Sequence, residues 1–513
     1  MVVHVNRSAR ATASGIAASA ETAASGVPRD PWQQLQQRVE ECREKFRQRP
    51  VTSVSMFAFE NELKALADDA CRQFLEQELN RLEPDDKKEM PNKVRFQKDT
   101  YRINKKSKAR IATRFGPIVL RSFYYLNAED GEPGLHPLHV QLGLGAGSAT
   151  PALAERLARM AVDHTQAEVR GWLLREHGLK WTNDRLRRSL AGVRRVLMPQ
   201  VGAPQKAKLL ERLKQAELSH GRNRPVLAVG RDGIMVPMRT GHYHEASTAT
   251  VTVYDRGRRR LCTIYLGQMP EAKQATLSLT LTDLLKEVLK DYAGPLPRLA
   301  YITDKGSAPN DYFHRVLKKM KHPNKPEQQL PWEWVLDFYH VCCYISKLAD
   351  ALFGAETKES RAWFKKMRHW LKHRRQGAAH VARSATQHLA LRKLSKAAKA
   401  EFWKAYRYLR RHFRLMDYAG YRRRGLPIGS GVTEAACKTV FTQRFKRSGM
   451  RWSQESGQVI LDLRTTYLSG IWEESYAAAL AAREIPEPIG LIGTNRQPGS
   501  CASPRDTISR FAA

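Results

Sequence analysis

Apolar residues recur at helical spacing near the start of the chain and at strand spacing further along. Between residues 31 and 82 this spacing predicts two helices that end before Pro84. From residue 93 to residue 127 the period shortens, and the string Thr113-Arg-Phe-Gly-Pro-Ile-Val-Leu-Arg predicts a β-hairpin that turns at Phe115-Gly116-Pro117. The N-terminal region is therefore expected to be mainly helical, with one hairpin.

Three short helical stretches follow, separated by turn-like residues. They are Ala152–Val162, Thr165–Glu176 and Thr182–Leu197. Such a bundle is a candidate helix-turn-helix, in which a polar face of the third helix meets a DNA groove. The residues of that face are Asn183, Arg185, Arg187 and Arg188. Plain packing of a small helical bundle explains the pattern equally well, so both interpretations stay open.

Strand-like and helix-like stretches alternate in the middle of the chain. Strands are expected at 225–238, 247–254, 261–266, 298–303 and 333–338, with helices at 275–292 and 311–319. Three antiparallel strands followed by alternating helix and strand predict a mixed five-stranded sheet. This order is similar to that of the RNase H fold, so the expected fold class is α/β with an RNase H-like sheet.

After Tyr339 the pattern stays helical to about Arg414, which predicts an all-helical insertion into the sheet domain. The expected regions are a flexible leader (1–30), N-terminal helices with the hairpin (31–127), a helix-turn-helix-like DNA-binding region (128–220), the first part of the RNase H-like core (221–340), the basic insertion (341–425), the last core helix with a C-terminal helix (426–484) and a flexible tail (485–513).

Charge restricts the function more than any other bulk property. The chain has 87 Lys and Arg against 51 Asp and Glu, a formal net charge of +36. This excess predicts a polyanionic partner, most commonly nucleic acid, with ribosome or membrane-surface association as the plainer alternatives. Residues 358–424, which make up most of the insertion, hold 21 Lys and Arg but 3 Asp and Glu, a net charge of +18. The hydrophobic content of 42% favours a folded enzyme over a basic tail protein.

Cysteine usage and hydropathy indicate the compartment. The seven cysteines are scattered and never spaced as Cys-x-x-Cys, so we expect neither a disulfide framework nor a zinc ribbon. No run of about 18 apolar residues is present to span a bilayer. The Ala/Ser-rich opening lacks the compact apolar core of a signal peptide. A cytoplasmic protein with no membrane partner is expected.

Two aspartates stand where strands of the predicted sheet end. Asp232 closes an otherwise apolar strand and precedes Gly233, and Asp304 follows the strand at 298–303, 72 residues later. In the expected order the first and fourth strands are neighbours, so the two carboxylates are expected side by side at one end of the sheet. Taken alone, Asp232 before Gly233 is better explained by a turn at a strand end.

A third acid, Glu434, begins a later helix. Ser430 or Thr433 is expected to cap this helix, which places Glu434 in the first turns with Lys438 and Phe441 on neighbouring positions of the same side. A glutamate that merely stabilises a helix N-terminus is the alternative.

The three acids together suit the metal-dependent chemistry of phosphodiester cleavage. Cleavage and strand transfer need an activated oxygen nucleophile and a stabilised leaving oxygen, and two Mg²⁺ ions about 4 Å apart provide both. Hard divalent ions prefer carboxylate oxygens. We therefore take Asp232, Asp304 and Glu434 as candidate catalytic and metal-binding residues for two Mg²⁺ ions, with Mn²⁺ as a substitute.

Two further sets of side chains surround these acids in the sequence. Asp337 and His340, at the end of the last strand, are expected to brace the site, and Asp337 is an alternative to Asp304 as the second acid. The candidate DNA-contacting residues are Lys438, Arg444, Lys446, Arg447, Arg451 and Trp452, together with Arg187 and Arg188. A solvated basic helix end is the plainer reading of that set.

Several strings resemble bacterial insertion-sequence transposases of the ISKra type. They are Arg231-Asp-Gly, Leu336-Asp-Phe-Tyr-His, Pro427-Ile-Gly-Ser-Gly-Val-Thr-Glu-Ala-Ala-Cys-Lys, Arg447-Ser-Gly-Met-Arg-Trp and the hairpin string, so the resemblance covers roughly residues 111 to 452. It implies a DDE enzyme related to Mutator-like and hAT-like transposases, with an all-helical insertion before the final Glu. It also implies Asp232, Asp304 and Glu434 as the triad, and Asp337 with His340 as the Asp-x-x-His element. The second acid departs from the pattern, since Thr303-Asp-Lys-Gly stands where Asp-Gly is expected.

The expected function is DNA cleavage and strand transfer by a transposase. The resemblance implies short terminal inverted repeats and target DNA as double-stranded partners, and assembly as a homodimer or higher oligomer. A non-catalytic, domesticated DNA-binding protein is one alternative, and an RNase H-like host nuclease is another. Strand transfer separates the first function from the other two.

Overall fold

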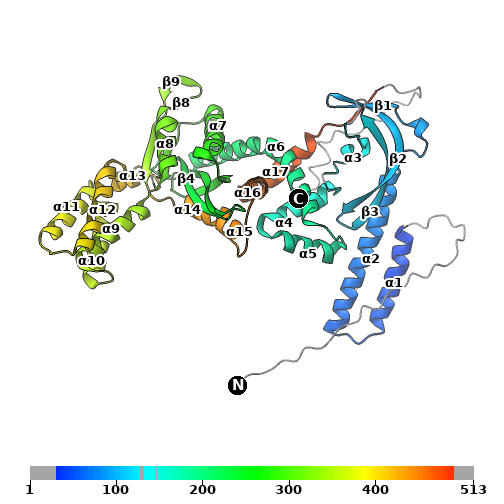
Figure 1. The fold of residues 1–513 in the computed structure, drawn as a ribbon, viewed down its shortest axis with the longest axis horizontal. Helices are drawn as coiled ribbons and strands as arrows, with labels where there is room; N and C mark the ends of the chain where they lie inside the picture. Colours follow the sequence, from blue (N-terminus) through cyan, green and yellow to red (C-terminus); the bar gives the residue numbers. More distant parts are fainter. Residues whose placement is uncertain (1–30, 128–131, 146, 305, 490–513) are drawn as a thin grey trace. The chain divides into compact units, whose positions relative to one another are not determined.

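The computed structural model describes residues 31–127, 132–145, 147–304 and 306–489, whose elements are labelled in Figure 1. The chain divides into two compact units, residues 1–78 and 79–513. The expected leader, residues 1–30, and residues 490–513 of the expected tail lie outside the described residues. No helix in the described ranges combines the length and apolarity needed to cross a lipid bilayer.

The first unit is a helical hairpin. Helix α1 (Pro31–Arg47) is followed by α2 (Ser53–Asn80), which ends two residues into the second unit. The rings of Phe46 and Phe59 stack at 4.4 Å, and Arg38 pairs with Asp69 at 3.0 Å. Contacts between the end of one helix and the start of the other require antiparallel helices. The two helices predicted from periodicity are confirmed.

A four-stranded sheet contains the predicted hairpin. Its strands are β1 (Lys93–Phe96), β2 (Asp99–Thr113), β3 (Gly116–Asn127) and β11 (Glu487–Ile489), in the order β11-β1-β2-β3. The hairpin turns where predicted but starts earlier, at Asp99. The prediction of a flexible tail from residue 485 is wrong for β11, because Glu487 to Ile489 pair with β1. Backbone groups alone make such a pairing, so tail composition does not report it.

The helical region after the hairpin contains α3 (Pro137–Gln141), α4 (Pro151–Asp163), α5 (Gln166–His177) and α6 (Asn183–Leu218). The three predicted helices are present, but α6 does not end at Leu197. It continues through Pro199 and Pro204 because buried residues recur every four positions along it, at Leu197, Val201, Gln205 and Leu209. Burial of this stripe offsets the backbone hydrogen bonds that the prolines remove.

The central sheet is mixed and five-stranded, as predicted. Its strands are β4 (Val226–Pro237), β5 (Tyr243–Tyr254), β6 (Arg260–Gln268), β7 (Arg298–Thr303) and β10 (Trp332–Leu336). The order is β10-β7-β4-β5-β6, with β4, β5 and β6 antiparallel and β4, β7 and β10 parallel. Helices α7 (Ala275–Asp291) and α8 (Ser307–Arg315) and the short hairpin β8 (Lys321–His322) and β9 (Lys325–Gln329) complete this part. The β8–β9 hairpin was not predicted.

Alternate residues of β4 enter two different cores. Leu227 and Val229 belong to the core that also contains buried residues of α4, α6, α7 and α16. Val226 and Ala228 belong to the core shared with the helical insertion. The period of two along a strand therefore assigns each later residue of β4 to one face of the sheet.

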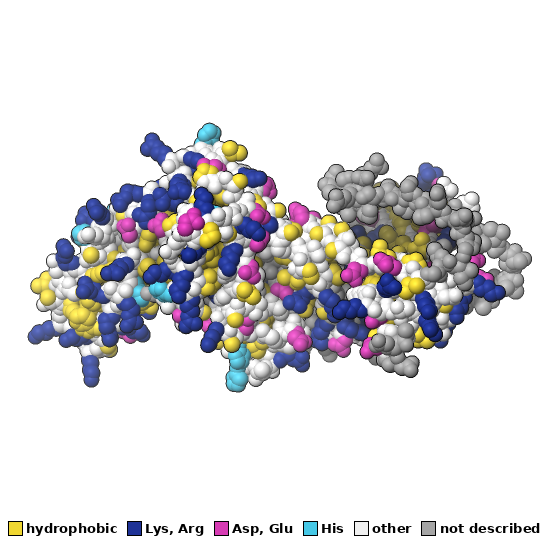
Figure 2. Space-filling model, turned by 90° about the horizontal axis from the view of Figure 1, so that it is seen from above, with side chains coloured by type: hydrophobic (Ala, Val, Ile, Leu, Met, Phe, Trp, Pro, Cys, Tyr) yellow, Lys and Arg dark blue, Asp and Glu magenta, His cyan; other side chains and the backbone are white. Residues whose placement is uncertain are grey.

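The insertion predicted between the last strand and the final acid is entirely helical. It comprises α9 (Phe338–Phe353), α10 (Lys358–His373), α11 (Gly377–Ala390), α12 (Lys396–His412) and α13 (Tyr418–Arg423). Trp363 and Phe402 are buried in its core, so these aromatics pack the helices. Figure 2 shows Lys and Arg side chains spread over its surface at the left of the view.

The chain then returns to the sheet domain. Helix α14 (Gly431–Ala436) continues into a π-helix (Cys437–Thr442) and α15 (Gln443–Phe445), followed by α16 (Gln454–Leu468) and α17 (Trp472–Ala481). Single 3₁₀ turns lie at Lys87–Glu89, Ala272–Gln274, Leu317–Lys319 and Phe413–Leu415.

Candidate functional site

Asp232 lies inside β4, five residues before the strand ends at Pro237, so its predicted place at a strand end is wrong. The strand continues because β5 pairs with it as far as Pro237. On the other side, β7 pairs with β4 only from Val226 to Gly230. Asp232 therefore stands two residues beyond the last residue that β7 covers.

Asp304 directly follows β7 and continues the register in which β7 pairs with β4. Gly230 is the partner of Ile302, an offset of 72 residues, and the same offset joins Asp232 to Asp304. The backbone N–H of Gly306 donates to Asp304 Oδ1 at 3.1 Å, which fixes the carboxylate at the start of the following turn.

Both aspartates fall on the face of the sheet that carries the helical insertion. Ala228 and Ile302 belong to the core on that face, and two-residue alternation carries the same side on to Asp232 and Asp304. Gly230, between Ala228 and Asp232, is where α14 approaches, since a Cβ at Gly230 would collide with Thr433 Oγ1. The glycine is required by this close approach of a side chain to the backbone.

Glu434 is held at the start of α14 by contacts other than those predicted. Ser430 makes no side-chain cap and instead donates its hydroxyl to Glu434 Oε1 at 3.1 Å. Thr433 is buried and its hydroxyl bonds to that of Thr250 on β5 at 2.8 Å. The side chain of Glu434 is exposed.

The predicted sidedness of this helix is correct only for its first turn. Lys438 is exposed like Glu434, four residues earlier, whereas Phe441 is fully buried. The π-helix from Cys437 to Thr442 adds a residue to the turn and rotates Phe441 away from the acidic side.

The electrostatics of Asp232 connect the three acids. Burial raises the pKa of Asp232, and the negative charges of Asp304 and Glu434 raise it further. A hydrogen bond from Cys437 Sγ to Asp232 Oδ2 at 3.2 Å and one from the Gly233 N–H to Oδ1 at 2.8 Å oppose this rise. Asp304 and Glu434 thus each lie close enough to Asp232 for their charges to act on its carboxyl group. A multivalent cation would relieve the repulsion between these charges.

The three acids supply the right donors for a hard divalent cation but not a finished ligand set. Within the described residues, no three His, Cys, Asp or Glu side chains stand at metal-ligand spacing. Carboxylate oxygens from two neighbouring strands and a helix are nevertheless the donor chemistry that Mg²⁺ prefers. Asp232, Asp304 and Glu434 are the residues that would hold such an ion.

Asp337 uses both carboxylate oxygens for backbone hydrogen bonds. It is fully buried and caps α9, accepting from the His340 N–H at 2.5 Å, and it also accepts from the Ser430 N–H. It thereby ties the end of β10 to the segment that leads into Glu434. The ring of His340 packs against Tyr408, whose hydroxyl donates to the backbone carbonyl of Asp304 at 3.5 Å. This geometry fits the bracing role expected of Asp337 and His340.

Two of the predicted DNA-contacting side chains are buried, which corrects that assignment. Arg444 is 1% exposed, and its Nε donates to the Ala161 carbonyl at 3.0 Å while its guanidinium lies over the Trp452 ring. Burial lowers the pKa of Arg444 to about 10. Trp452 is 8% exposed and donates from Nε1 to the Phe445 carbonyl at 3.0 Å. Both side chains are therefore held by contacts within the protein.

The remaining predicted DNA-contacting side chains are exposed. They are Arg187, Arg188, Lys438, Lys446, Arg447 and Arg451. Arg187 pairs with Asp184 at 3.0 Å, and Arg447 with Glu168 at 3.4 Å. Exposed pairs of this kind are weak and exchange readily for phosphate oxygens.

Sequence reasoning missed Cys437 and Gly230 as site residues. Cys437 stands three positions after Glu434, so one helical turn brings it to the same side, and that spacing was a usable signal. The role of Gly230 depends on Thr433, about 200 residues away, and no local pattern reports it.

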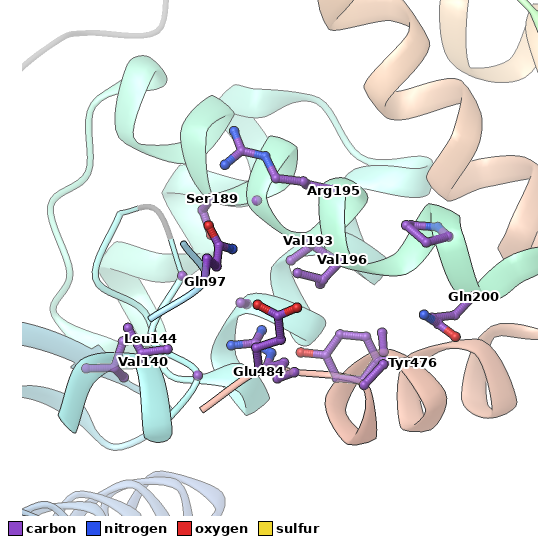
Figure 3. Close-up of a pocket in the computed structure, with 18 of the residues that line it drawn as sticks. Gln97, Val140, Leu144, Ser189, Val193, Arg195, Val196, Gln200, Tyr476 and Glu484 are labelled. Atoms are coloured by element: carbon purple, nitrogen blue, oxygen red, sulfur yellow. The ribbon is translucent and has the colours of Figure 1, made fainter. Parts of the chain in front are cut away.

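A separate cavity of about 500 Å³ lies elsewhere, lined by α6, α17 and the β1–β2 turn, with Ser189, Arg195, Tyr476 and Glu484 around it (Figure 3). None of the three candidate acids lines it. It therefore plays no part in the arrangement described above.

Comparison with known proteins adds no assignment, because no family model matches the chain and no curated protein matches it at a significant level.

Proposed function

We propose that this protein is a DNA transposase with an RNase H-like core that cleaves DNA and transfers the cut strand with two Mg²⁺ ions. The observation that carries the proposal is the convergence of three carboxyl groups, in which Asp304 and Glu434 raise the pKa of a half-buried Asp232. The strand order β10-β7-β4-β5-β6, with an all-helical insertion before Glu434, is the order expected of that fold and supports the assignment.

The chain's own residues would position the reaction. Divalent ions bound to the three acids would supply charge for the attacking and leaving oxygens of an in-line displacement. The β4–β7 register fixes Asp232 and Asp304, and the contacts of Thr433 with Thr250 and of Ser430 with Glu434 fix the third acid. Such fixed placement is what phosphoryl transfer requires of a protein, since most of the catalysis is positioning and charge stabilisation.

Double-stranded DNA is the proposed substrate, with terminal inverted repeats and target DNA as its two forms and a homodimer or larger oligomer as the active assembly. The net charge of +36 supports a DNA partner. The repeats and the oligomer rest on the resemblance in the sequence.

The test uses a plasmid that carries the DNA flanking the gene for this chain, incubated with the purified protein, Mg²⁺ and a second target plasmid. Cleavage at the two ends and joining to the target are expected for the wild type, and neither for Asp232→Asn or Glu434→Gln. DNA binding without metal-dependent cleavage would instead assign a non-catalytic DNA-binding protein. Cleavage of branched or flap DNA without any joining would assign a host nuclease.

A further inference from the structure

An arginine-lined groove of about 500 Å³ lies next to the C-terminal end of β4. Five arginines line it: Arg170 on α5, Arg187 on α6, Arg239 after β4, Arg451 before α16 and the buried Arg444 on α15. None of the residues that line the groove is Asp or Glu. Arg239 and Arg451 are exposed and form no ion pair with any carboxylate in the described part of the chain. The groove is therefore a concentrated positive surface that attracts anions.

Backbone polarity adds to this charge. The N-cap of α5 (Thr165), the first residue of α6 (Asn183) and the N-cap of α16 (Ser453) all line the groove. Each helix N-terminus carries a partial positive charge that favours phosphate. The first turn of each helix also holds one capped N–H and one acid, which is Glu168, Asp184 or Glu455. These acids offset part of the helix charge, so the positive surface of the groove rests mainly on its arginine side chains.

The groove is attached rigidly to the strand that carries Asp232. Trp452 pairs with Met238 in a parallel bridge, in which the Trp452 N–H donates to the Pro237 carbonyl at 3.1 Å and the Arg239 N–H to the Trp452 carbonyl at 2.9 Å. Buried Arg444 and Trp452 lie under this segment and hold it in place. The arginines before and after the bridge thus keep a fixed distance from the acids.

We propose that this groove binds the phosphodiester backbone of duplex DNA and sets the position of the DNA relative to the three carboxyl groups. Arg239 follows Asp232 by seven residues, so the two lie at most about 23 Å apart along an extended strand at about 3.3 Å per residue. Successive nucleotides of one DNA strand rise by about 3.4 Å along the helix axis, so a duplex lying along this direction would meet the groove within about seven nucleotides of the phosphate at the acids. The location of that phosphate rests on the proposed function, whereas backbone binding does not.

The test measures binding of the full chain to a linear duplex of arbitrary sequence in EDTA over a range of salt concentrations. Arg239→Ala/Arg451→Ala should weaken binding about tenfold or more and reduce the slope of log Kd against log salt by about two, because two phosphate contacts are lost. Lys286→Ala/Lys290→Ala, which removes the same charge from the exposed side of α7, should leave the slope near that of the wild type. Arg451→Lys, which keeps the charge, should bind nearly as the wild type and guards against a folding defect.

Equal DNA affinity of the Arg239→Ala/Arg451→Ala and Lys286→Ala/Lys290→Ala variants would overturn the proposal. So would a wild-type protein that does not bind duplex DNA. Chemical modification of phosphates provides the position: interference within about seven nucleotides of the cut is expected for the wild type, and its persistence in Arg239→Ala/Arg451→Ala would count against the groove. If DNA binding depends on the groove arginines but the wild type never cleaves DNA, the proposed function is wrong and the groove proposal stands. If the wild type cleaves DNA but the groove variants bind it as well as the wild type does, the groove proposal is wrong and the proposed function stands.

Discussion

Asp232 and Asp304 are separated by the same 72 residues as every residue pair that joins β4 to β7. The placement of the two carboxylates therefore follows from the backbone ladder of two parallel strands and not from a local turn. Glu434 joins them from a helix that contacts β4 at Gly230. The candidate site is built on rigid elements, as precise placement of reacting groups requires.

The role of Asp337 can be separated from that of Asp304 by conservative variants. Asp304→Asn should abolish Mg²⁺-dependent cleavage with little change in stability, because within the described residues its side chain accepts one hydrogen bond, from the N–H of Gly306. Asp337→Ala should lower the free energy of unfolding by about 3 kcal/mol, because two backbone N–H groups lose a charged acceptor. Denaturant unfolding and the cleavage assay measure the two effects. An Asp337→Asn protein of wild-type stability without activity, beside an active Asp304→Asn protein, would make Asp337 the second acid.

The contact of α14 with the sheet predicts a steric effect at Gly230. Gly230→Ala should displace Thr433 and with it Glu434, lowering the free energy of unfolding by about 1–3 kcal/mol and reducing cleavage strongly. In Gly230→Ala/Thr433→Ala the colliding hydroxyl is absent, so part of the stability should return. A single Gly230→Ala variant that unfolds and cleaves like the wild type would show that α14 does not pack here.

Arg444 is predicted to act through stability and not through DNA. Arg444→Ala should lower the free energy of unfolding by about 2–4 kcal/mol, since it strands the Ala161 carbonyl and removes packing from Trp452. Lys446→Ala, two positions on and exposed, should change stability by less than about 0.5 kcal/mol. Thermal unfolding of both variants decides the matter, and equal midpoints would contradict a buried structural role.

How far the sequence predicts this structure depends on the range of the interactions involved. The central sheet, the hairpin and the insertion follow from hydrophobic period and turn residues, which are local. Arg444 could not be recognised as buried, because its carbonyl partner lies on Ala161, 283 positions earlier. The continuation of α6 past Pro199 and the pairing of β11 likewise depend on distant partners. For the site, the spacing of Asp232 and Asp304 was informative because it equals a strand register.

A half-buried histidine pair predicts acid sensitivity of the hairpin sheet. His136 and His139 stack at 4.3 Å, and Ser122 hydrogen-bonds to both rings. Burial lowers the pKa of both rings from 6.5, that of His139 to about 4 with help from His136. Since the folded pKa values are depressed, the stabilisation is full above the unfolded value of 6.5 and is lost as pH falls towards about 4.

The unfolding midpoint should therefore fall through this pH window, and the fall should be shallower in His139→Gln. The comparison between the two proteins isolates the histidine, because other acidic groups contribute equally to both. Parallel pH profiles would contradict the assignment.

The most direct test of the three-carboxyl site is a titration of the full chain with Mn²⁺ followed by electron paramagnetic resonance. Asp232→Asn, Asp304→Asn and Glu434→Gln should each weaken Mn²⁺ binding by about tenfold or more, while Glu455→Gln, at an exposed position on α16, should bind as the wild type does. If the three variants bind Mn²⁺ as tightly as the wild type, or if their affinities differ from the wild type no more than that of Glu455→Gln does, these acids do not share a metal site.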